Sequence, residues 1–374
     1  MCLQNRSVLI QNADFQRNDP ESLFFGRLIP QFQPSKGSES LSGPLGKLPE
    51  ALAGTTVAVI GFGNQGFAHA LNLRDSGVQV VVGTRKGQTG WKNALEAGLT
   101  PVEIAQATAK AELVIVALPD EIHEKLWTSD IQPFLKPSAV VGFLHGFSVH
   151  HGLVKAAPEI GIVMVAPKGP GKTLRDRFVS GQGLPALFAV HQGGSNPART
   201  RALALAWAAG IGSARAAIVE TTFAHETETD LFGEQTVLCG GVVALMQAAF
   251  ETLVKAGYPA DLAYMECCQE LKQITDLIFE KGLAATRHAI SNTAEFGGFV
   301  AGETLIDDTV KQRMQALLAD IRSGAFGKRL HADAAAGFPW LKAQRAAAAG
   351  HPIEQAGASV RQWMPWLMQS EKET

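Results

Sequence analysis

The 374-residue sequence has few cysteines, few charged residues and no excess of either charge. Its four cysteines include no CxxC pair, so we expect small buried thiols in a reducing compartment rather than a disulfide framework. The 33 basic residues are balanced by 35 acidic ones, and the basic footprint of a nucleic-acid-binding protein is therefore missing. Nucleic acid is not an expected partner.

Long apolar runs are also missing. No segment reaches about 18 consecutive apolar residues, so we expect no membrane-spanning helix and no membrane partner. The N-terminus contains Asp14, Asp19 and Glu21 and lacks the apolar stretch of a secretory signal. At 46% hydrophobic residues, the chain is too apolar for a disordered protein. These absences predict a folded cytoplasmic protein, and the length suggests about two domains.

Short apolar runs alternate with helix-like stretches from Thr55 onward. Two such stretches are Gln65–Ser76 and Asn196–Ala209. This alternation predicts an α/β fold with a parallel sheet covered on both faces. The runs are rich in Val, Ile and Ala: Val57–Ile60, Val78–Val82, Leu113–Leu118, Ala139–Leu144, Ile162–Ala166 and Ala186–Val190.

The second half of the chain has a helical pattern, and strand signals fade after about Val219. Leu238–Ala256 and Leu262–Lys281 are long stretches with few Gly or Pro residues. An α/β half followed by a helical half predicts two domains. We expect an N-terminal extension over 1–53, a Rossmann-type NADP-binding domain over 54–220, and an all-α domain over 221–374.

Both ends of the chain are distinctive. In the N-terminal extension, the segment Ser22–Leu28 is apolar enough to dock on the body or on a partner subunit. Near the C-terminus, residues 363–367 read Trp-Met-Pro-Trp-Leu. We expect this aromatic end to pack onto the body of the protein.

A glycine-rich turn follows the first apolar run directly. Gly61-Phe62-Gly63-Asn64-Gln65-Gly66 opens a helix, which is the strand–turn–helix context that a dinucleotide site requires. Gly61 permits the tight turn, Gly63 lets the backbone approach a pyrophosphate, and Gly66 lets helix and strand pack closely. The helix N-terminus offers free N–H groups to the phosphates. A glycine-rich turn of another α/β fold is the alternative interpretation.

The second apolar run lacks the carboxylate that usually binds the ribose of NAD. About 20 residues after the glycines, Val82 leads instead into Gly83-Thr84-Arg85-Lys86-Gly87. Arg85, together with Lys86, can pair with a 2′-phosphate, although a solvated basic turn would show the same residues. The sequence therefore favours NADP over NAD.

Two pairs of carboxylates are spaced four residues apart in the helical half: Asp230 with Glu234, and Glu266 with Glu270. On a helix each pair projects from one face, and like charges at this spacing repel unless a cation lies between them. Carboxylates without a histidine at ligand spacing suit a hard cation such as Mg²⁺. Two solvated acidic faces are the alternative.

Residues with ionisable side chains also follow three of the apolar runs. His145 follows Ala139–Leu144, Lys168 comes shortly after Ile162–Ala166, and Asp120 comes shortly after the run that ends at Leu118. In open α/β sheets, ligands bind beyond the carboxyl ends of the strands. Taken singly, each residue is as compatible with a structural role as with a catalytic one.

Taken together, these motifs make the chain resemble ketol-acid reductoisomerase, also called acetohydroxyacid isomeroreductase. The resemblance runs from about Leu52 to Leu367, and ETETDLFGEQ with ISNTAE is highly specific to the family. Further matching stretches are GFGNQGFAHALNLRDSGVQVVVGTRKG, LPDE, HGF, VAPKGPG, ECCQELK and HPIEQAGASVRQWMPWL. The single helical domain suggests the short-chain class. Its C-terminal helices interlock as a knotted domain between two subunits, which implies at least a homodimer.

The resemblance implies a metal and substrate site. Asp230 and Glu234 match the carboxylates that hold two Mg²⁺ ions, and Glu266 and Glu270 match the pair that completes the site from the partner subunit. Ser291 matches the serine that contacts the substrate carboxylate.

The resemblance also implies catalytic and cofactor-binding residues. His145 and Lys168 match catalytic residues beside the nicotinamide, and Glu270 is expected to relay a proton. We expect the NADPH site to include the following residues: Gly61, Phe62, Gly63, Asn64, Gln65, Gly66, Arg85, Lys86, Thr89, Pro119, Asp120, His145 and Gly171.

The implied reaction converts a 2-hydroxy-2-methyl-3-oxo acid, such as 2-acetolactate or 2-aceto-2-hydroxybutanoate, into a 2,3-dihydroxy-3-methyl acid by alkyl migration and hydride reduction. Some positions depart from the family pattern. Gln88 and Gly90 stand where members commonly have serines, and Ser148 and Lys172 also differ. The alternatives are a paralogue acting on a related 2-oxo or 2-hydroxy acid in a specialised pathway, an enzyme that only reduces, and an inactive NADP-binding regulator.

Overall fold

A computed structural model describes residues 50–370 of the chain. The segment Ser22–Leu28 and nearly all of the predicted extension lie outside these residues. The described part begins with a short 3₁₀ turn, Glu50–Leu52, which packs against helix α7 (Pro197–Gly210). Leu52 is only 1% exposed, so the core of the nucleotide-binding half includes a residue that precedes the predicted boundary at 53/54.

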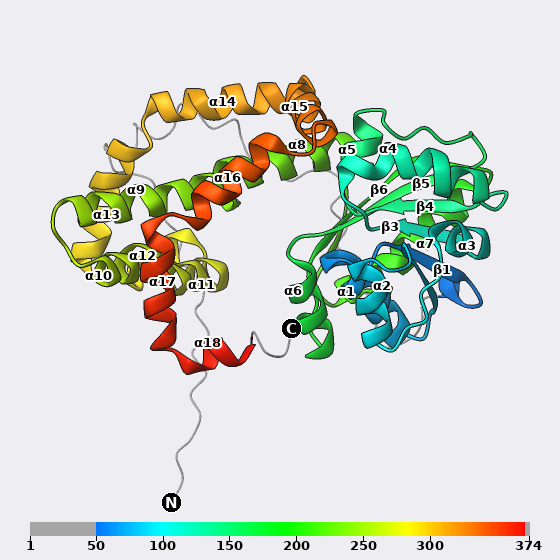
Figure 1. The fold of residues 1–374 in the computed structure, drawn as a ribbon, viewed down its shortest axis with the longest axis horizontal. Helices are drawn as coiled ribbons and strands as arrows, with labels where there is room; N and C mark the ends of the chain where they lie inside the picture. Colours follow the sequence, from blue (N-terminus) through cyan, green and yellow to red (C-terminus); the bar gives the residue numbers. More distant parts are fainter. Residues whose placement is uncertain (1–49, 371–374) are drawn as a thin grey trace, which may run out of the picture. The chain divides into compact units, whose positions relative to one another are not determined.

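Seven strands form one sheet in the order β2-β1-β3-β4-β5-β6-β7 (Figure 1). β1 to β5 run parallel to one another, β6 runs antiparallel to β5, and β7 runs parallel to β6. The strands are β1 (Thr56–Ile60), β2 (Gln79–Gly83), β3 (Leu113–Val116), β4 (Val140–Phe143), β5 (Gly161–Pro167), β6 (Ala186–Gly193) and β7 (Ile218–Glu220).

The predicted parallel arrangement is wrong at β6, which runs antiparallel to β5, and β7, which no predicted run included, runs parallel to β6. After β5 the chain forms helix α6 (Gly171–Val179) and returns to the same end of β5, where the Lys168 N–H donates to the Pro185 carbonyl at 2.8 Å. β6 therefore starts beside the end of β5 and runs back along it, pairing Ala186 with Pro167. An apolar run fixes the burial of a strand but not its direction, so the sequence pattern does not distinguish the two cases.

Helices cover both faces of the sheet, as predicted. Alternate strand residues divide between two buried clusters, so that Val57 and Val59 belong to one and Ala58 and Ile60 to the other. The first cluster contains the fully buried Trp207. The helices of this half are α1 (Asn64–Asp75), α2 (Thr89–Glu96), α3 (Ile104–Lys110), α4 (His123–Leu126), α5 (Phe147–His150), α6 and α7, with shorter turns at Asp120–Ile122, Trp127–Ile131, Gln132–Phe134 and Ser213–Arg215.

The second half is helical throughout the described residues, as predicted. Its helices are α8 (Phe223–Gly233), α9 (Gly241–Lys255), α10 (Ala260–Tyr264), α11 (Leu271–Lys281), α12 (Leu283–His288), α13 (Asn292–Leu305), α14 (Asp308–Arg322), α15 (Ala325–Ala335), α16 (Pro339–Ala349), α17 (Pro352–Gln362) and α18 (Pro365–Ser370). Two π-helical segments, η7 (Glu234–Leu238) and η8 (Met265–Gln269), widen the helices at the predicted metal ligands Glu234 and Glu266. Such segments are frequent at functional sites.

The helix Phe223–Lys255, which joins α8, η7 and α9, is long and apolar enough to cross a membrane by length and composition alone. It also contains Glu226 and Asp230, which take part in the side-chain cluster described below. The expectation that no segment spans a membrane rested on uninterrupted apolar runs, and it stays a prediction.

The aromatic C-terminal end does not bury itself within the chain. Met364 contacts the body, since its Sδ accepts from the Gln269 Nε2 at 3.2 Å. Trp363 is 55% exposed and Trp366 is 66% exposed, so the expectation that this aromatic end packs onto the body is wrong for the two tryptophans within the single chain. α17 instead packs through a different set of side chains, because Ile353 and Ala356 join a small buried cluster with Phe250.

Candidate active site

The glycine-rich turn between β1 and α1 has the geometry of a dinucleotide cradle. Gly61 has φ +97°, and a Cβ there would collide with the Ala117 carbonyl oxygen. A Cβ at Gly66 would collide with the carbonyl oxygen of Gly61. A Cβ at Gly63 would meet no atom within 4 Å, so the turn is open at the position where a pyrophosphate approaches the backbone. These residues fit a bound dinucleotide.

The side chains of Asn64 and Gln65 fix this turn against the loop that follows β5. The Gln65 Nε2 donates to the Gly169 carbonyl at 3.0 Å, and the Asn64 Oδ1 accepts from the Lys172 N–H at 3.1 Å. Gly171 approaches the backbone of Asn64 so closely that a Cβ would collide with it. The sequence-predicted residues Asn64, Gln65 and Gly171 thus lie together and shape the cradle.

The other predicted cofactor residues lie at the carboxyl ends of β2 and β3. Arg85 and Lys86 follow β2 and are exposed, and Thr89 begins α2. Pro119 and Asp120 follow β3, and partial burial raises the pKa of the Asp120 carboxyl. All five lie beyond the same edge of the sheet as the glycine-rich turn.

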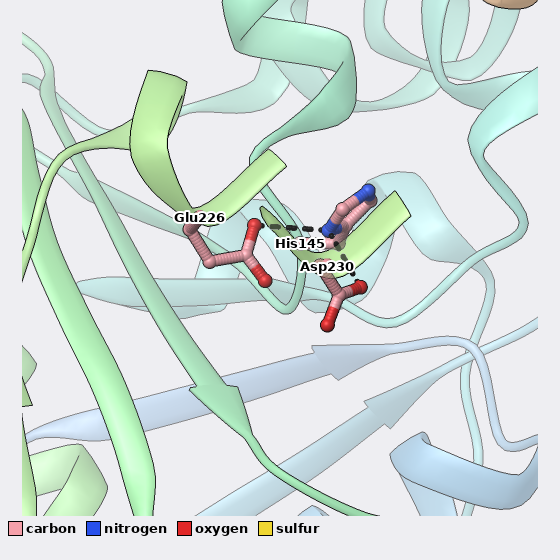
Figure 2. A group of neighbouring side chains, drawn as sticks. All are labelled: His145, Glu226 and Asp230. Atoms are coloured by element: carbon pink, nitrogen blue, oxygen red, sulfur yellow. Dashed lines mark ion pairs between the residues drawn. The ribbon is translucent and has the colours of Figure 1, made fainter. Parts of the chain in front are cut away.

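Four charged side chains meet at this edge, and Figure 2 shows three of them, His145, Glu226 and Asp230. His145 follows β4, Lys168 follows β5, and Glu226 and Asp230 lie one turn apart on α8. The His145 Nδ1 is 2.9 Å from the Glu226 Oε2 and 3.4 Å from the Asp230 Oδ2. The Lys168 Nζ donates to the Glu226 Oε1 at 3.0 Å and to the Asp230 Oδ1 at 2.8 Å. The structure therefore brings His145, Lys168 and Asp230 together, and the roles that the resemblance implies for them stay predictions.

Glu226 is the most buried member of this cluster, with only 1% of its side chain exposed. Its Oε2 also accepts the Gly146 N–H at 2.8 Å, which ties α8 to the loop after β4. Burial opposes ionisation, but His145, Lys168 and this N–H outweigh it and lower the pKa of Glu226. Glu226 is therefore an ionised carboxylate that holds both cations in place.

Sequence reasoning missed Glu226. It recognised the pair Asp230 and Glu234 but not the carboxylate four residues earlier in the same ETETD stretch. The i, i+4, i+8 spacing of Glu226, Asp230 and Glu234 was the available signal, because it places three carboxylates along one side of a helix.

The charges of the cluster shift the pKa of each cation upward. Burial opposes the protonated form of His145, but the Glu226 carboxylate, with Asp120 and Asp230, raises its pKa to about 9. Burial likewise opposes the charge of Lys168, and Glu226 and Asp230 raise its pKa. At neutral pH His145 is an imidazolium and can act as a proton donor in the site.

Glu234 lies at the end of α8 with its charge near the cluster. Burial, and then the negative charge of Asp230, raise the pKa of the Glu234 carboxyl. A cation bound between two such carboxylates offsets their mutual repulsion and stabilises both in the ionised form. Their all-oxygen donor set fits a hard divalent cation such as Mg²⁺.

The second predicted carboxylate pair does not join this cluster within the chain. Over residues 50–370, the one group of three possible metal ligands whose donor atoms lie within 4.8 Å of one another is His145, Glu226 and Asp230. Glu266 lies in η8 and Glu270 lies between η8 and α11. Ser291 caps α13, where its Oγ accepts the Ala294 N–H at 3.2 Å. The assignment of Glu266 and Glu270 to the partner's site stays a prediction, as does the contact of Ser291 with the substrate.

Ser148, where the family pattern has asparagine, has a buried partner. Its Oγ is 2.8 Å from the His123 Nδ1, and the His123 Nε2 is 2.9 Å from the Leu118 carbonyl oxygen. A carbonyl only accepts, so Nε2 has the proton, and Nδ1 accepts from the Ser148 hydroxyl. This pair links two elements. His123 lies in α4, which follows the turn that contains Asp120, and Ser148 lies in α5, which begins two residues after His145.

Comparison with protein families matches nearly all of the described chain. Residues 51–217 match the NADPH-binding domain of acetohydroxy acid isomeroreductase, and residues 223–366 match the C-terminal domain of ketol-acid reductoisomerase. An NADH-preferring ketol-acid reductoisomerase from an uncultured archean is 39% identical, with a TM-score of 0.81 over 84% of this chain and 96% of that one.

A more distant structure shares the fold alone. It is a semialdehyde dehydrogenase NAD-binding protein from Cupriavidus necator, solved with calcium and NAD, at 21% identity and a TM-score of 0.56. The match covers 72% of this chain and 99% of that one. The predicted combination of a Rossmann-type half and a helical half is confirmed. The chain belongs to the ketol-acid reductoisomerase family, whose members are oxidoreductases and isomerases that use a nicotinamide cofactor in branched-chain amino-acid biosynthesis.

Proposed function

We propose that this protein is a cytoplasmic, NADPH- and Mg²⁺-dependent ketol-acid reductoisomerase that converts 2-acetolactate and 2-aceto-2-hydroxybutanoate into 2,3-dihydroxy-3-methyl acids. The observation that carries the proposal is the cluster of His145, Lys168, Glu226 and Asp230. It lies beyond the carboxyl ends of β4 and β5, at the same edge of the sheet as the dinucleotide cradle. A reaction that combines hydride transfer with rearrangement of a charged substrate needs charged side chains next to the site of the dinucleotide.

The residues of the chain have separable tasks in this reaction. When bound, two Mg²⁺ ions supply Lewis-acid polarisation of the substrate oxygens, and the nicotinamide supplies the hydride. Asp230 and Glu234 would hold the metal ions. Lys168 orients the Asp230 carboxylate through its 2.8 Å hydrogen bond. The imidazolium of His145 can give a proton to an oxygen that becomes more basic during the reaction.

Glu266, Glu270 and Ser291 are proposed to reach the site from a second copy of the chain. The helical half exposes large apolar side chains that a monomer in water would bury, including Phe279 at 83% and Phe296 at 74% exposure. An obligate dimer interface accounts for this exposure. In such a dimer, Glu270 would relay the proton of the substrate hydroxyl, and Ser291 would bind the substrate carboxylate.

One assay tests the proposal and separates the two half-reactions. The purified protein with Mg²⁺ and NADPH is given 2-acetolactate and, separately, the already rearranged 3-hydroxy-3-methyl-2-oxobutanoate, and NADPH oxidation is followed. We expect oxidation with both substrates. Turnover of the rearranged acid alone would show a reductase without isomerase activity. No turnover of either would contradict the proposal and favour a paralogue with another substrate.

A variant makes the same assay specific to the metal site. Asp230→Asn removes one negative charge from the Mg²⁺ ligands, and we expect the isomerisation of 2-acetolactate to be lost. Unchanged turnover of 2-acetolactate in this variant would contradict the role assigned to Asp230.

A further inference from the structure

The turn that follows β2 contains no Asp or Glu residue, but the carboxylate of a residue from another segment lies beside it. The segment that precedes α3 pairs with the end of β2: the Val102 N–H donates to the Val82 carbonyl, and the Thr84 N–H donates to the Val102 carbonyl, both at 2.9 Å. Glu103 is the next residue. The fold thus places Glu103 beside the basic turn that contains Arg85 and Lys86.

The Glu103 carboxylate is directed at this turn. Its Oε1 accepts a hydrogen bond from the Lys86 backbone N–H at 3.2 Å. Glu103 is also the residue that caps α3, yet its side chain makes no capping hydrogen bond to that helix. The Glu103 carboxylate therefore contacts the β2 turn and does not cap its own helix.

We propose that Glu103 is a selectivity-determining residue that moderates the preference for NADPH over NADH. In doubly wound folds, the ribose 2′ group of the adenosine is bound at the end of the second strand, where a carboxylate accepts from the 2′-hydroxyl. Glu103 supplies that carboxylate through space, about twenty residues later in the chain than the usual position. This inference rests on the proposed binding of a dinucleotide at Gly61–Gly66.

The charges around the 2′ position oppose one another. Arg85 and Lys86 are exposed and form no ion pair within residues 50–370, so both are available to a 2′-phosphate. Glu103 repels that phosphate and also occupies the Lys86 N–H, a donor that a phosphate oxygen would otherwise use. A 2′-hydroxyl meets no such repulsion. The turn therefore attracts NADPH less strongly than its two cations alone would.

Binding of the oxidised cofactors tests this directly, without turnover. Isothermal titration calorimetry gives the Kd of NADP⁺ and of NAD⁺ for the wild type, Glu103→Gln and Glu159→Gln. The glutamine keeps an oxygen that can accept the Lys86 N–H, so this variant removes the charge alone. Glu159 is an exposed carboxylate before the amino end of β5, so its variant changes the net charge equally at the opposite edge of the sheet.

We expect Glu103→Gln to shift the ratio of the two Kd values about fivefold toward NADP⁺, because one like charge near the 2′-phosphate is removed. Glu159→Gln should leave the ratio within about twofold of the wild type, since the charge is distant and screened. Glu103→Ala, which also removes the acceptor, should additionally weaken NAD⁺ binding.

Two other results would overturn the inference in different ways. If both cofactors bind but Glu103→Gln leaves their Kd ratio unchanged, Glu103 does not set selectivity, and the proposed function stands. If the folded wild type binds neither dinucleotide, the proposed function fails as well. Thermal melts of each variant show whether the protein is folded in the titration.

Discussion

At the scale of single residues, the site depends on Glu226. Its buried carboxylate contacts His145, Lys168 and the Gly146 N–H, so one side chain positions groups from two strand ends. Burying a carboxylate is costly unless its charge is compensated, and here two cations and a backbone donor compensate it. The same contacts keep His145 protonated at neutral pH, because they raise its pKa to about 9.

Glu226→Gln should therefore change the titration of His145. Without the Glu226 charge, burial lowers the pKa of His145 with less opposition, and we expect the pKa to fall well below about 9 in the metal-free protein. NMR titration of the imidazole, assigned with a His145→Gln variant, measures this. Glu228→Gln is the matched control, since Glu228 lies on the same helix and pairs with His150 and Arg322 instead. A pKa of His145 that is equal in wild type and Glu226→Gln would contradict the role of Glu226.

The raised pKa of His145 also predicts how stability depends on pH. Its folded-state pKa of about 9 lies above the ordinary value of 6.5. The stabilisation is therefore complete below pH 6.5 and is lost as the pH rises through 9. Thermal melts of the metal-free protein should show a fall in Tm across this window that is weaker in Glu226→Gln. If the Tm of the wild type and of Glu226→Gln fell equally across this window, groups other than His145 would cause the pH dependence.

At the scale of elements, the glycine-rich turn does two tasks with different residues. Gly61 and Gly66 let the turn and α1 pack, because a Cβ at either would collide with a carbonyl oxygen. Gly63 leaves open space where the cofactor's phosphates approach. Packing and binding can therefore be separated by substitution.

Gly66→Ala should cost about 2 kcal/mol or more of the free energy of unfolding, since the added methyl group has no room beside the Gly61 carbonyl. Gly63→Ala should leave the free energy of unfolding nearly unchanged but weaken dinucleotide binding, because its methyl group enters the open cradle. Denaturant unfolding and cofactor titration of both variants check this. Equal stability of the two variants would contradict the assigned division.

The sequence predicted most of the strands, but it did not predict the direction of β6 or the contact between Glu103 and the β2 turn. Each end of strands β1 to β6 lies within three residues of the predicted run, because buried strands are short apolar runs with clear boundaries. The direction of β6 was not predictable, since it depends on how α6 returns the chain. Glu103 was missed for a similar reason: it reaches the β2 turn through strand pairing and not through sequence spacing.

At the scale of the whole molecule, the described chain brings together only part of the predicted site. His145, Lys168, Glu226 and Asp230 meet within it, whereas Glu266 and Glu270 are not part of that cluster. The exposed apolar side chains of the helical half, such as Phe279 and Phe296, are what the proposed dimer interface would cover. No pattern in one sequence could place a residue that acts across a subunit boundary, which is why this part of the site came from the family resemblance.

One complementation measurement tests whether the isomeroreductase site is shared between two chains. Asp230→Asn and Glu266→Gln variants, each expected to be inactive, are co-expressed with different tags, and the turnover of 2-acetolactate with NADPH and Mg²⁺ is compared with that of each variant alone. If the site is shared, each mixed dimer contains one site with both residues intact, and an unsorted equal mixture recovers about a quarter of wild-type activity. If each chain used its own four carboxylates, every site in every dimer would contain a substitution. The mixture would then be as inactive as each variant alone, and that result would contradict a site shared between two chains.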